Sequence, residues 1–300
     1  MIYYRNTKDI RADASVVTLG KFDGLHIGHR KLLEEMRRQK SEALPGVMFT
    51  FDQKDFRSRS ILTEEERREK AALLGVDIFV DWPFDDETRS MEPERFVREI
   101  LCGRLGAKLL IVGTDFRFGH DRAGDVETLK HFSEKYGYEV EVIEKVTYQG
   151  QEVSSTRIRD AVSKGQMEDV TAMLSEPLSL SGEIVRGTRI GTSIGVPTIN
   201  LKPNEEKLLP PYGVYVSTAE VDGITYPSIS DLGVKPSVSD ENEPGLETHL
   251  LFHDEDLYGK RALIRLVHFL RAEQKFDSPE ALKKQIRRDC ESARQYFEYD

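Results

Sequence analysis

The chain has 300 residues, a formal net charge of −10 at pH 7, 38% hydrophobic residues and 32% charged residues. At about 150 residues per domain this length predicts two domains, and no apolar run approaches the roughly 18 residues that a membrane-spanning helix needs. Residues 1–180 carry 28 basic and 33 acidic side chains, and residues 181–300 carry 15 and 20. Nonspecific nucleic-acid binding needs a phosphate-neutralising surface, so we expect no nucleic-acid partner and no membrane partner.

The two cysteines, Cys102 and Cys290, are too far apart for a disulfide framework or a zinc-binding spacing. The first residues lack the basic and then apolar pattern of a signal peptide. We therefore expect a cytoplasmic protein.

Residues 1–177 alternate short apolar runs with helical patterns. This alternation predicts a mostly parallel sheet with helices on its faces, in which ligands bind at the carboxyl ends of the strands. Helices are expected over 29–40, over 63–74 from a capping box at Thr63–Glu66, over 93–105, and from Gly124-Asp125 onward. The expected strands are 16–20, 47–51, 77–81, 108–113 and 138–146.

After Pro177 the pattern changes to short β-rich segments separated by Gly and Pro, which is typical of an antiparallel sandwich or barrel. Ser278 and Pro279 then predict the N-cap and first position of a helix that runs to about Phe297. We predict domains 1–177 and 178–300. The expected strands of the second domain are 178–185, 198–201, 213–221, 224–229, 247–252 and 262–270.

Residues 20–29 (GKFDGLHIGH) follow the first expected strand and run into a helix. The free N–H groups and positive dipole end of a helix N-terminus suit a phosphate, and histidines three apart lie on one side of a helical turn. His26 and His29 can therefore donate two hydrogen bonds to one phosphoryl group. A tight turn with two incidental histidines is the structural alternative, and a metal pair would lack an evident third ligand.

The HxGH pattern after a strand resembles the nucleotidylyltransferase superfamily, and GKFDGLHIGH resembles its flavin-adenylating branch. Residues 113–119 (GTDFRFG) resemble that family's loop near the adenine and flavin, and residues 154–159 (SSTRIR) resemble its second signature. The resemblance implies that His26 and His29 contact the reacting phosphates, and that Asp115, Phe116 and Phe118 contact flavin or nucleotide. It assigns ATP binding to Gly20, Phe22, Asp23, Gly24, Gly28, Ser155, Thr156 and Arg157.

The second half resembles riboflavin kinases at residues 195–200 (GVPTIN), 246–251 (LETHLL), 256–259 (DLYG), 269–271 (FLR) and 275–276 (KF). The whole chain is thus similar to the prokaryotic bifunctional riboflavin kinase/FAD synthetase family. This implies a Rossmann-like nucleotidylyltransferase domain followed by an all-β kinase barrel with a terminal helix. It also implies ATP and flavin contacts at Gly187, Gly191, Pro197 and Arg271, Mg²⁺ ligands at Thr198 and Asn200, and a general base at Glu247.

The implied reactions are phosphorylation of riboflavin to FMN and adenylylation of FMN to FAD, with ATP and Mg²⁺ in both. The chain departs from the family pattern at Thr192, Ile199, Ser230-Asp231 and His253. These departures keep one alternative open, a non-enzymatic flavin-binding or regulatory protein with a degenerate kinase half. Another nucleotidylyltransferase whose β-barrel has a different purpose is the second alternative. Partners are small-molecule substrates, and transient self-association stays open.

Overall fold

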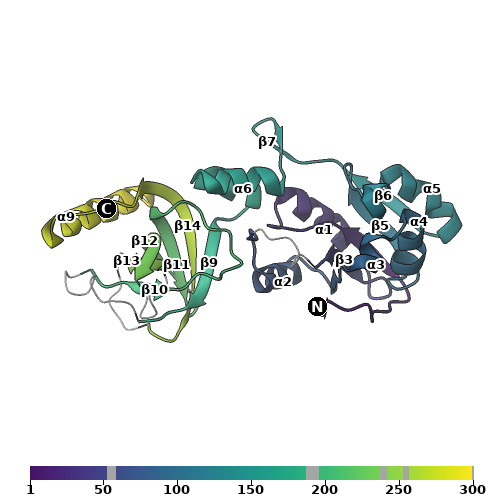
Figure 1. Ribbon diagram of the computed structural model, residues 1–300, viewed down its shortest axis with the longest axis horizontal. Coiled ribbons are helices and arrows are strands. Elements are labelled where there is room, and N and C mark those ends of the chain that lie inside the picture. The colour runs from purple at the N-terminus through teal and green to yellow at the C-terminus, as the bar shows by residue number, and fades with distance from the viewer. Residues whose placement is uncertain (53–58, 187–195, 237–241, 253–256, 299–300) are drawn as a thin grey trace. The chain divides into compact units, whose positions relative to one another are not determined.

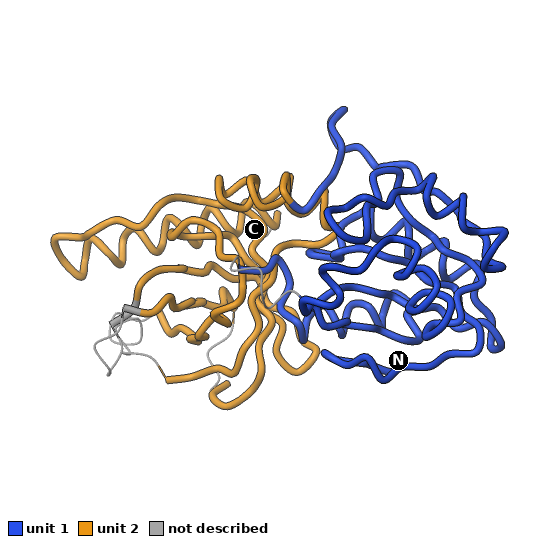
Figure 2. The backbone as a smooth tube through the Cα atoms, turned by 45° about the vertical axis from the view of Figure 1, so that its right-hand side comes forward, with its two compact units in different colours: residues 1–155 blue, residues 156–300 orange. Residues whose placement is uncertain are grey.

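The computed structural model describes residues 1–52, 59–186, 196–236, 242–252 and 257–298. The chain forms two compact units, Met1–Ser155 and Thr156–Asp300 (Figure 2). The sequence instead predicts a domain boundary between residues 177 and 178, which remains a prediction. No helix in the described part of the chain is long and apolar enough to cross a membrane.

The first unit is built on a six-stranded sheet in the order β1-β4-β3-β2-β5-β6, and every neighbouring pair is parallel (Figure 1). This confirms the predicted parallel α/β architecture. The edge strand β1 was not predicted, because its four residues are half-buried or exposed and give no apolar run. The strands are β1 (Ile2–Arg5), β2 (Ser15–Leu19), β3 (Gly46–Phe51), β4 (Ile78–Trp82), β5 (Ala107–Gly113) and β6 (Glu139–Ile143).

Two apolar clusters cover the two faces of this sheet. On one face, Val16, Met48 and Phe79 pack with Leu33 and Met36 of α1 and with Ala71 of α2. The opposite face packs with η2 and α5, and a β7–β8 hairpin precedes the end of the unit. The remaining elements are α1 (Ile27–Gln39), α2 (Glu64–Leu73), α3 (Asp86–Arg89), α4 (Pro93–Arg95), η2 (Phe96–Cys102), η3 (His120–Arg122), α5 (Val126–Tyr136), β7 (Thr147–Tyr148) and β8 (Gln151–Glu152).

The local signals in the sequence correspond to real helix ends. Thr63 and Glu66 form the reciprocal capping box of α2, and the Asp125 side chain caps α5. The helix expected over 93–105 begins as α4 but continues as the π-helix η2. Its buried residues pack in the apolar cluster on one face of the sheet.

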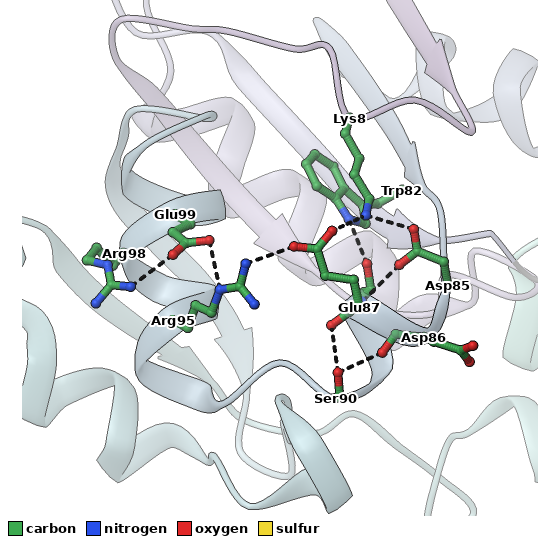
Figure 3. Close-up of polar contacts among 10 residues, drawn as sticks. Lys8, Trp82, Asp85, Asp86, Glu87, Ser90, Arg95, Arg98 and Glu99 are labelled. Carbon is green, nitrogen blue, oxygen red and sulfur yellow. Dashed lines mark hydrogen bonds and ion pairs between the residues drawn. The ribbon is translucent and has the colours of Figure 1, made fainter.

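An ion-pair network orders the surface segment after β4 (Figure 3). Lys8 Nζ lies 2.7 Å from an Asp85 carboxylate oxygen and 2.8 Å from Glu87, and Arg95 joins Glu87 to Glu99. Exposed ion pairs of this kind contribute little to the free energy of unfolding, because solvent and salt screen them. The network therefore positions α3 and α4 relative to one another more than it stabilises the unit.

The second unit contains a six-stranded antiparallel sheet in the order β10-β13-β12-β11-β14-β9, as predicted. Val185 N donates to Asn200 O at 2.9 Å, so the chain after β9 also pairs with β10 and brings the two sheet edges together. Ser278 caps α9, with Pro279 at its first position, as predicted. The elements are α6 (Ser155–Ser163), α7 (Met167–Leu174), β9 (Leu178–Glu183), β10 (Ile199–Leu201), β11 (Gly213–Val221), β12 (Ile224–Pro236), β13 (Asn242–Leu250), β14 (Arg261–Ala272) and α9 (Pro279–Tyr296).

Helix α7 was not predicted, and it packs against β14 within this unit. Its apolar residues Met167, Val170 and Met173 are buried, and Glu168 Oε1 lies 2.5 Å from His268 Nδ1 on β14. Residues 167–174, which lie between the SSTRIR motif and the first strand of the antiparallel sheet, therefore form a packed helix.

Candidate functional site

The loop between β2 and α1 has an unusual backbone. Phe22, Gly24 and Leu25 have φ values of 49°, 90° and 45°, a region that non-glycine residues rarely adopt and that clusters at functional sites. The Phe22 side chain is fully buried, and a Cβ on Gly20 would lie 3.2 Å from its ring. The loop therefore needs Gly20 for space, and the Phe22 ring is part of the core rather than an exposed nucleotide contact.

The two histidines stand at the start of α1. His26 is the N-cap residue, and its Nδ1 accepts a long hydrogen bond from His29 N at 3.4 Å. The two rings are stacked with centroids 3.7 Å apart, and the Phe22 ring packs against His29 at 5.1 Å. A Cβ on Gly28 would lie 3.2 Å from the His26 ring. The glycines of this motif thus make room for the side chains that order the histidines.

Both imidazoles are neutral at pH 7. Burial lowers the pKa of His26 to about 4, and burial together with the neighbouring His26 lowers the pKa of His29 well below its usual value. Because His26 Nδ1 accepts a hydrogen bond, its proton is on Nε2. His29 Nδ1 is buried with no partner in the described part of the chain, and a buried N–H without an acceptor is costly. Each ring therefore presents one Nε2–H donor.

We expect ¹⁵N NMR to detect both histidines as neutral Nε2–H tautomers from pH 8 down to about pH 5. The reason is that burial opposes the second proton on either ring. Protonation of His26 near pH 6.5 would contradict the assignment.

The loop is tied to two distant segments. The Asp23 carboxylate accepts a hydrogen bond from Ile61 N at 3.0 Å, and the Asp23 carbonyl accepts one from Ser155 Oγ at 2.8 Å. Ser155 of the predicted second signature thus reaches the histidine loop. Thr156 and Arg157 follow in the first turn of α6 but belong to the second unit, so their place in this site stays a prediction.

The loop after β5 carries one charged and two aromatic residues of the predicted site, Asp115, Phe116 and Phe118. Asp115 is exposed and pairs with Lys145 at 3.1 Å, which also pairs with Glu152 of the β7–β8 hairpin at 2.7 Å. Phe116 is half-buried and stacks on buried Phe118, with centroids 5.6 Å apart. Of the three residues that the sequence assigned to flavin or nucleotide contact here, Asp115 and Phe116 reach the surface and Phe118 supports Phe116.

Sequence reasoning missed two aromatic residues at the same edge of the sheet. Phe51 ends β3 and Phe84 follows β4, their ring centroids are 5.2 Å apart, and both are half-buried. Phe96 of η2 connects them to the β5 loop, with centroids 6.0 Å from Phe51 and 5.7 Å from Phe118. Aromatic rings are strong packing surfaces for a planar ligand. A phenylalanine at or shortly after the ends of β3, β4 and β5 was the signal in the sequence.

In the second unit, strand register brings the predicted kinase residues together. Asn200 on β10 lies directly opposite Glu247 on β13, and Glu247 lies opposite Asp231 on β12. Directly opposite residues of antiparallel strands point to the same face. Thr198 and Asn200 are half-buried and flank buried Ile199, as expected for residues two apart. The Asn200 amide and the Glu247 carboxylate thus belong to one polar row, and Thr198, which directly precedes β10, stays a predicted member of it.

Other predicted kinase contacts have structural partners or lie outside the described residues. The His249 ring donates through Nδ1 to the carbonyl of exposed Pro197 at 2.8 Å, and burial lowers the pKa of His249. The Arg271 guanidinium binds buried Asp289 of α9 through Nε at 3.2 Å and Nη2 at 2.8 Å, which anchors α9 to β14. Gly187 and Gly191 lie outside the described residues.

The donor set near Asn200 fits a hard cation bound together with a nucleotide. Mg²⁺ prefers oxygen ligands, keeps several waters and is usually held by one or two protein groups plus substrate phosphates. Over the described ranges, no group of three or more His, Cys, Asp or Glu side chains could hold a metal by itself. Thr198 and Asn200 supply oxygens only, so an ion there would depend on the phosphates for the rest of its shell.

Comparison with known proteins matches both halves of the chain. Residues 8–157 match the family model of FAD synthetase, and residues 174–297 match that of riboflavin kinase. The chain is 34% identical to the bifunctional riboflavin kinase/FMN adenylyltransferase of Pseudomonas fluorescens, covering 93% of this chain and 92% of the relative. It is 32% identical to the protein of the same description from Escherichia coli K12, covering 97% and 96%.

A solved structure from Streptococcus pneumoniae, described as a macrolide-efflux protein, has the same architecture. Its TM-score is 0.87 at 30% sequence identity, covering 98% of each chain.

Proposed function

Because the chain belongs to the family of bifunctional riboflavin kinases/FMN adenylyltransferases, we propose that it phosphorylates riboflavin to FMN with ATP and then adenylylates FMN to FAD. The observation that carries the proposal is that each half of the chain matches the family model of one activity. Each half also brings its own polar motif residues together: the two histidine rings stack in the first unit, and Asn200 lies opposite Glu247 in the second.

For the kinase step, Glu247 accepts the proton of the ribityl 5′-hydroxyl as that oxygen attacks the γ-phosphorus of ATP and ADP leaves. An alcohol is a poor nucleophile at neutral pH, so a positioned base speeds the step. Thr198 and Asn200 would hold Mg²⁺ together with the ATP phosphates, where the ion would supply positive charge for phosphoryl transfer. The register that sets Asn200 beside Glu247 supports this division of roles.

For the adenylyl step, the FMN phosphate attacks the α-phosphorus of ATP and pyrophosphate leaves. The phosphate needs no protein base, because its second pKa is about 6 and it is largely ionised at pH 7. Catalysis then depends on positioning and on donors aimed at the developing charge. The Nε2–H groups of His26 and His29 supply two donors, with further phosphate contacts from Ser155, Thr156 and Arg157.

The aromatic surface at the strand ends favours one orientation of the flavin. Phe51, Phe84 and Phe116 are half-buried and lie at the carboxyl ends of β3, β4 and β5, where ligands of such sheets bind. We place the isoalloxazine ring of FMN against them, with the phosphate toward the histidines. Asp115 and Lys145 border this surface.

The test is incubation of the chain with riboflavin, ATP and Mg²⁺, resolving FMN and FAD by chromatography over time. We expect FMN to appear first and FAD to follow, with both lost on chelation of Mg²⁺. A non-enzymatic flavin-binding protein would form neither product. A nucleotidylyltransferase with an unrelated barrel would convert supplied FMN to FAD but would leave riboflavin unchanged.

We expect a fragment of residues 178–300 to fold alone and to phosphorylate riboflavin, because the whole polar row lies within it. It should melt at a lower temperature than a fragment of residues 156–300, since it lacks α7, whose buried face packs on β14. Circular dichroism and a kinase assay of both fragments check this. A soluble, folded but inactive 178–300 fragment beside an active full chain would refute the independent module.

A further inference from the structure

One buried ion pair in the first unit has no role in the reactions described above. Asp81, at the carboxyl end of β4, and Arg67 of α2 have exposed fractions of 2% and 6%, and their one contact joins Arg67 Nη2 to Asp81 Oδ2 at 3.2 Å. Arg67 Nε and Asp81 Oδ1 are buried without a hydrogen-bond partner in the described part of the chain. A buried pair whose polar atoms are incompletely satisfied stabilises little, so stability alone does not explain this one.

The groups that face Asp81 come from three elements. From β1, the Tyr3 hydroxyl lies 3.3 Å from Asp81 Oδ2 and donates to Glu64 of α2 at 3.0 Å. Arg67 of α2 supplies the positive charge, and Asp52 after β3 adds a negative one. Burial raises the pKa of Asp81 to about 6, with Asp52 and Glu64 adding to the rise and Arg67 and Tyr3 opposing it.

Helix α2 connects this pair to the histidine loop. Thr63 caps the helix one turn before Arg67. Two residues earlier, fully buried Ile61 donates its N–H to the Asp23 carboxylate at 3.0 Å. Asp23 is three residues before His26. The position of α2 on the sheet therefore sets the position of the donor that holds this loop.

We propose that Asp81 is a positioning residue for adenylyl transfer: by binding Arg67 it fixes the start of α2, and through Ile61 and Asp23 it fixes the loop on which His26 and His29 stand. The inference rests on the proposed adenylyl transfer. Loss of the Asp81 charge frees α2 to shift, and the histidine donors then lose their alignment with the phosphates.

The test is Asp81→Asn in the full chain, assayed at pH 8 with saturating FMN, ATP and Mg²⁺. We expect kcat of FAD formation to fall about tenfold to hundredfold, since displacement of catalytic groups by about 1 Å costs up to 10²-fold. Riboflavin phosphorylation by the same protein should be unchanged. Asp77→Asn is the matched control, because Asp77 pairs with Lys40 at 2.7 Å beside the opposite end of β4. It should leave both rates unchanged.

A spectroscopic readout is available in the next residue. Trp82 is the single tryptophan of the chain, is 3% exposed, and its Nε1 donates to Thr88 Oγ1 at 3.3 Å (Figure 3). In the free enzyme, its fluorescence should show a transition near pH 6, where Asp81 loses its proton, and Asp77→Asn should keep it. Asp81→Asn should abolish this transition.

Two results would overturn the inference: wild-type kcat of FAD formation in Asp81→Asn at pH 8, or a fluorescence transition near pH 6 that persists in that variant. If Asp81→Asn fails to fold, the double variant Arg67→Gln/Asp81→Asn replaces it, because this variant leaves no unpaired buried cation. The same two measurements are then made on the double variant. A wild-type chain that forms no FAD would refute the proposed function itself, whereas FAD formation with normal Asp81→Asn kinetics refutes only this positioning role.

Discussion

Replacing His29 with alanine should abolish FAD formation while riboflavin is still converted to FMN. In the proposed mechanism the Nε2–H of His29 is one of two donors to the reacting phosphates, and loss of one such donor typically costs about 10²–10³ in rate. FMN should therefore accumulate in a reaction started with riboflavin and ATP. The measurement is the initial rate of FAD formation from supplied FMN beside the rate of FMN formation from riboflavin.

Two further histidine variants accompany this test. His131→Ala removes an exposed histidine from α5 and should leave both rates unchanged. His26→Ala removes the other donor and the stacked ring, so it should impair FAD formation by a similar factor. Normal FAD yield from His29→Ala would remove this side chain from the site.

Replacing Glu247 with glutamine should have the opposite effect on the two activities. The substitution preserves size and one acceptor oxygen but removes the base, and general-base catalysis is worth about 10²–10⁴-fold. Riboflavin phosphorylation should fall by that factor, while supplied FMN is still adenylylated. The fold should survive, since the change is nearly isosteric.

The control for this variant lies on the same strand. Glu243→Gln makes the same change four residues earlier on β13, where the side chain pairs with Lys202 at 2.6 Å, and it should leave kinase turnover unchanged. Glu247 could instead only hydrogen-bond the ribityl chain. In that case, the KM for riboflavin would rise while kcat stayed within a few-fold, and a saturation curve separates the two roles.

The effect of pH on FAD formation should follow the FMN phosphate and Asp81, and not the histidines. Burial lowers the pKa of His26 to about 4, so His26 stays neutral near pH 6. The FMN phosphate has a second pKa of about 6, so it gains a proton and loses its dianionic form as the pH falls through this value. The structure thus assigns the acid limb near pH 6 to FMN and, through the proposed positioning role, to Asp81.

Local interactions explain why so many elements were predictable. A capping box, a Pro at the first helical position and an apolar period each act between residues a few positions apart. The sequence therefore located α2 from Thr63 and Glu66, α9 from Ser278 and Pro279, and the strands of both sheets except β1. Motif residues such as His26, Ser155 and Asn200 were identified because short segments of the sequence resemble signatures of known families. Strand β1 and helix α7 have no such signal, since packing against β4 and β14 stabilises them.

The sequence by itself determined the two fold classes, their order, and the motifs that carry the chemistry, because these depend on composition and short spacing. Only the tertiary structure decided how the motif residues act. Gly20 and Gly28 make room for the rings of Phe22 and His26, Asn200 stands opposite Glu247, and Asp81 meets Arg67 beneath α2. Each of these depends on strand register or on burial by distant residues. Those are long-range properties of the folded chain, and they set the tautomers, charges and contacts on which the reactions depend.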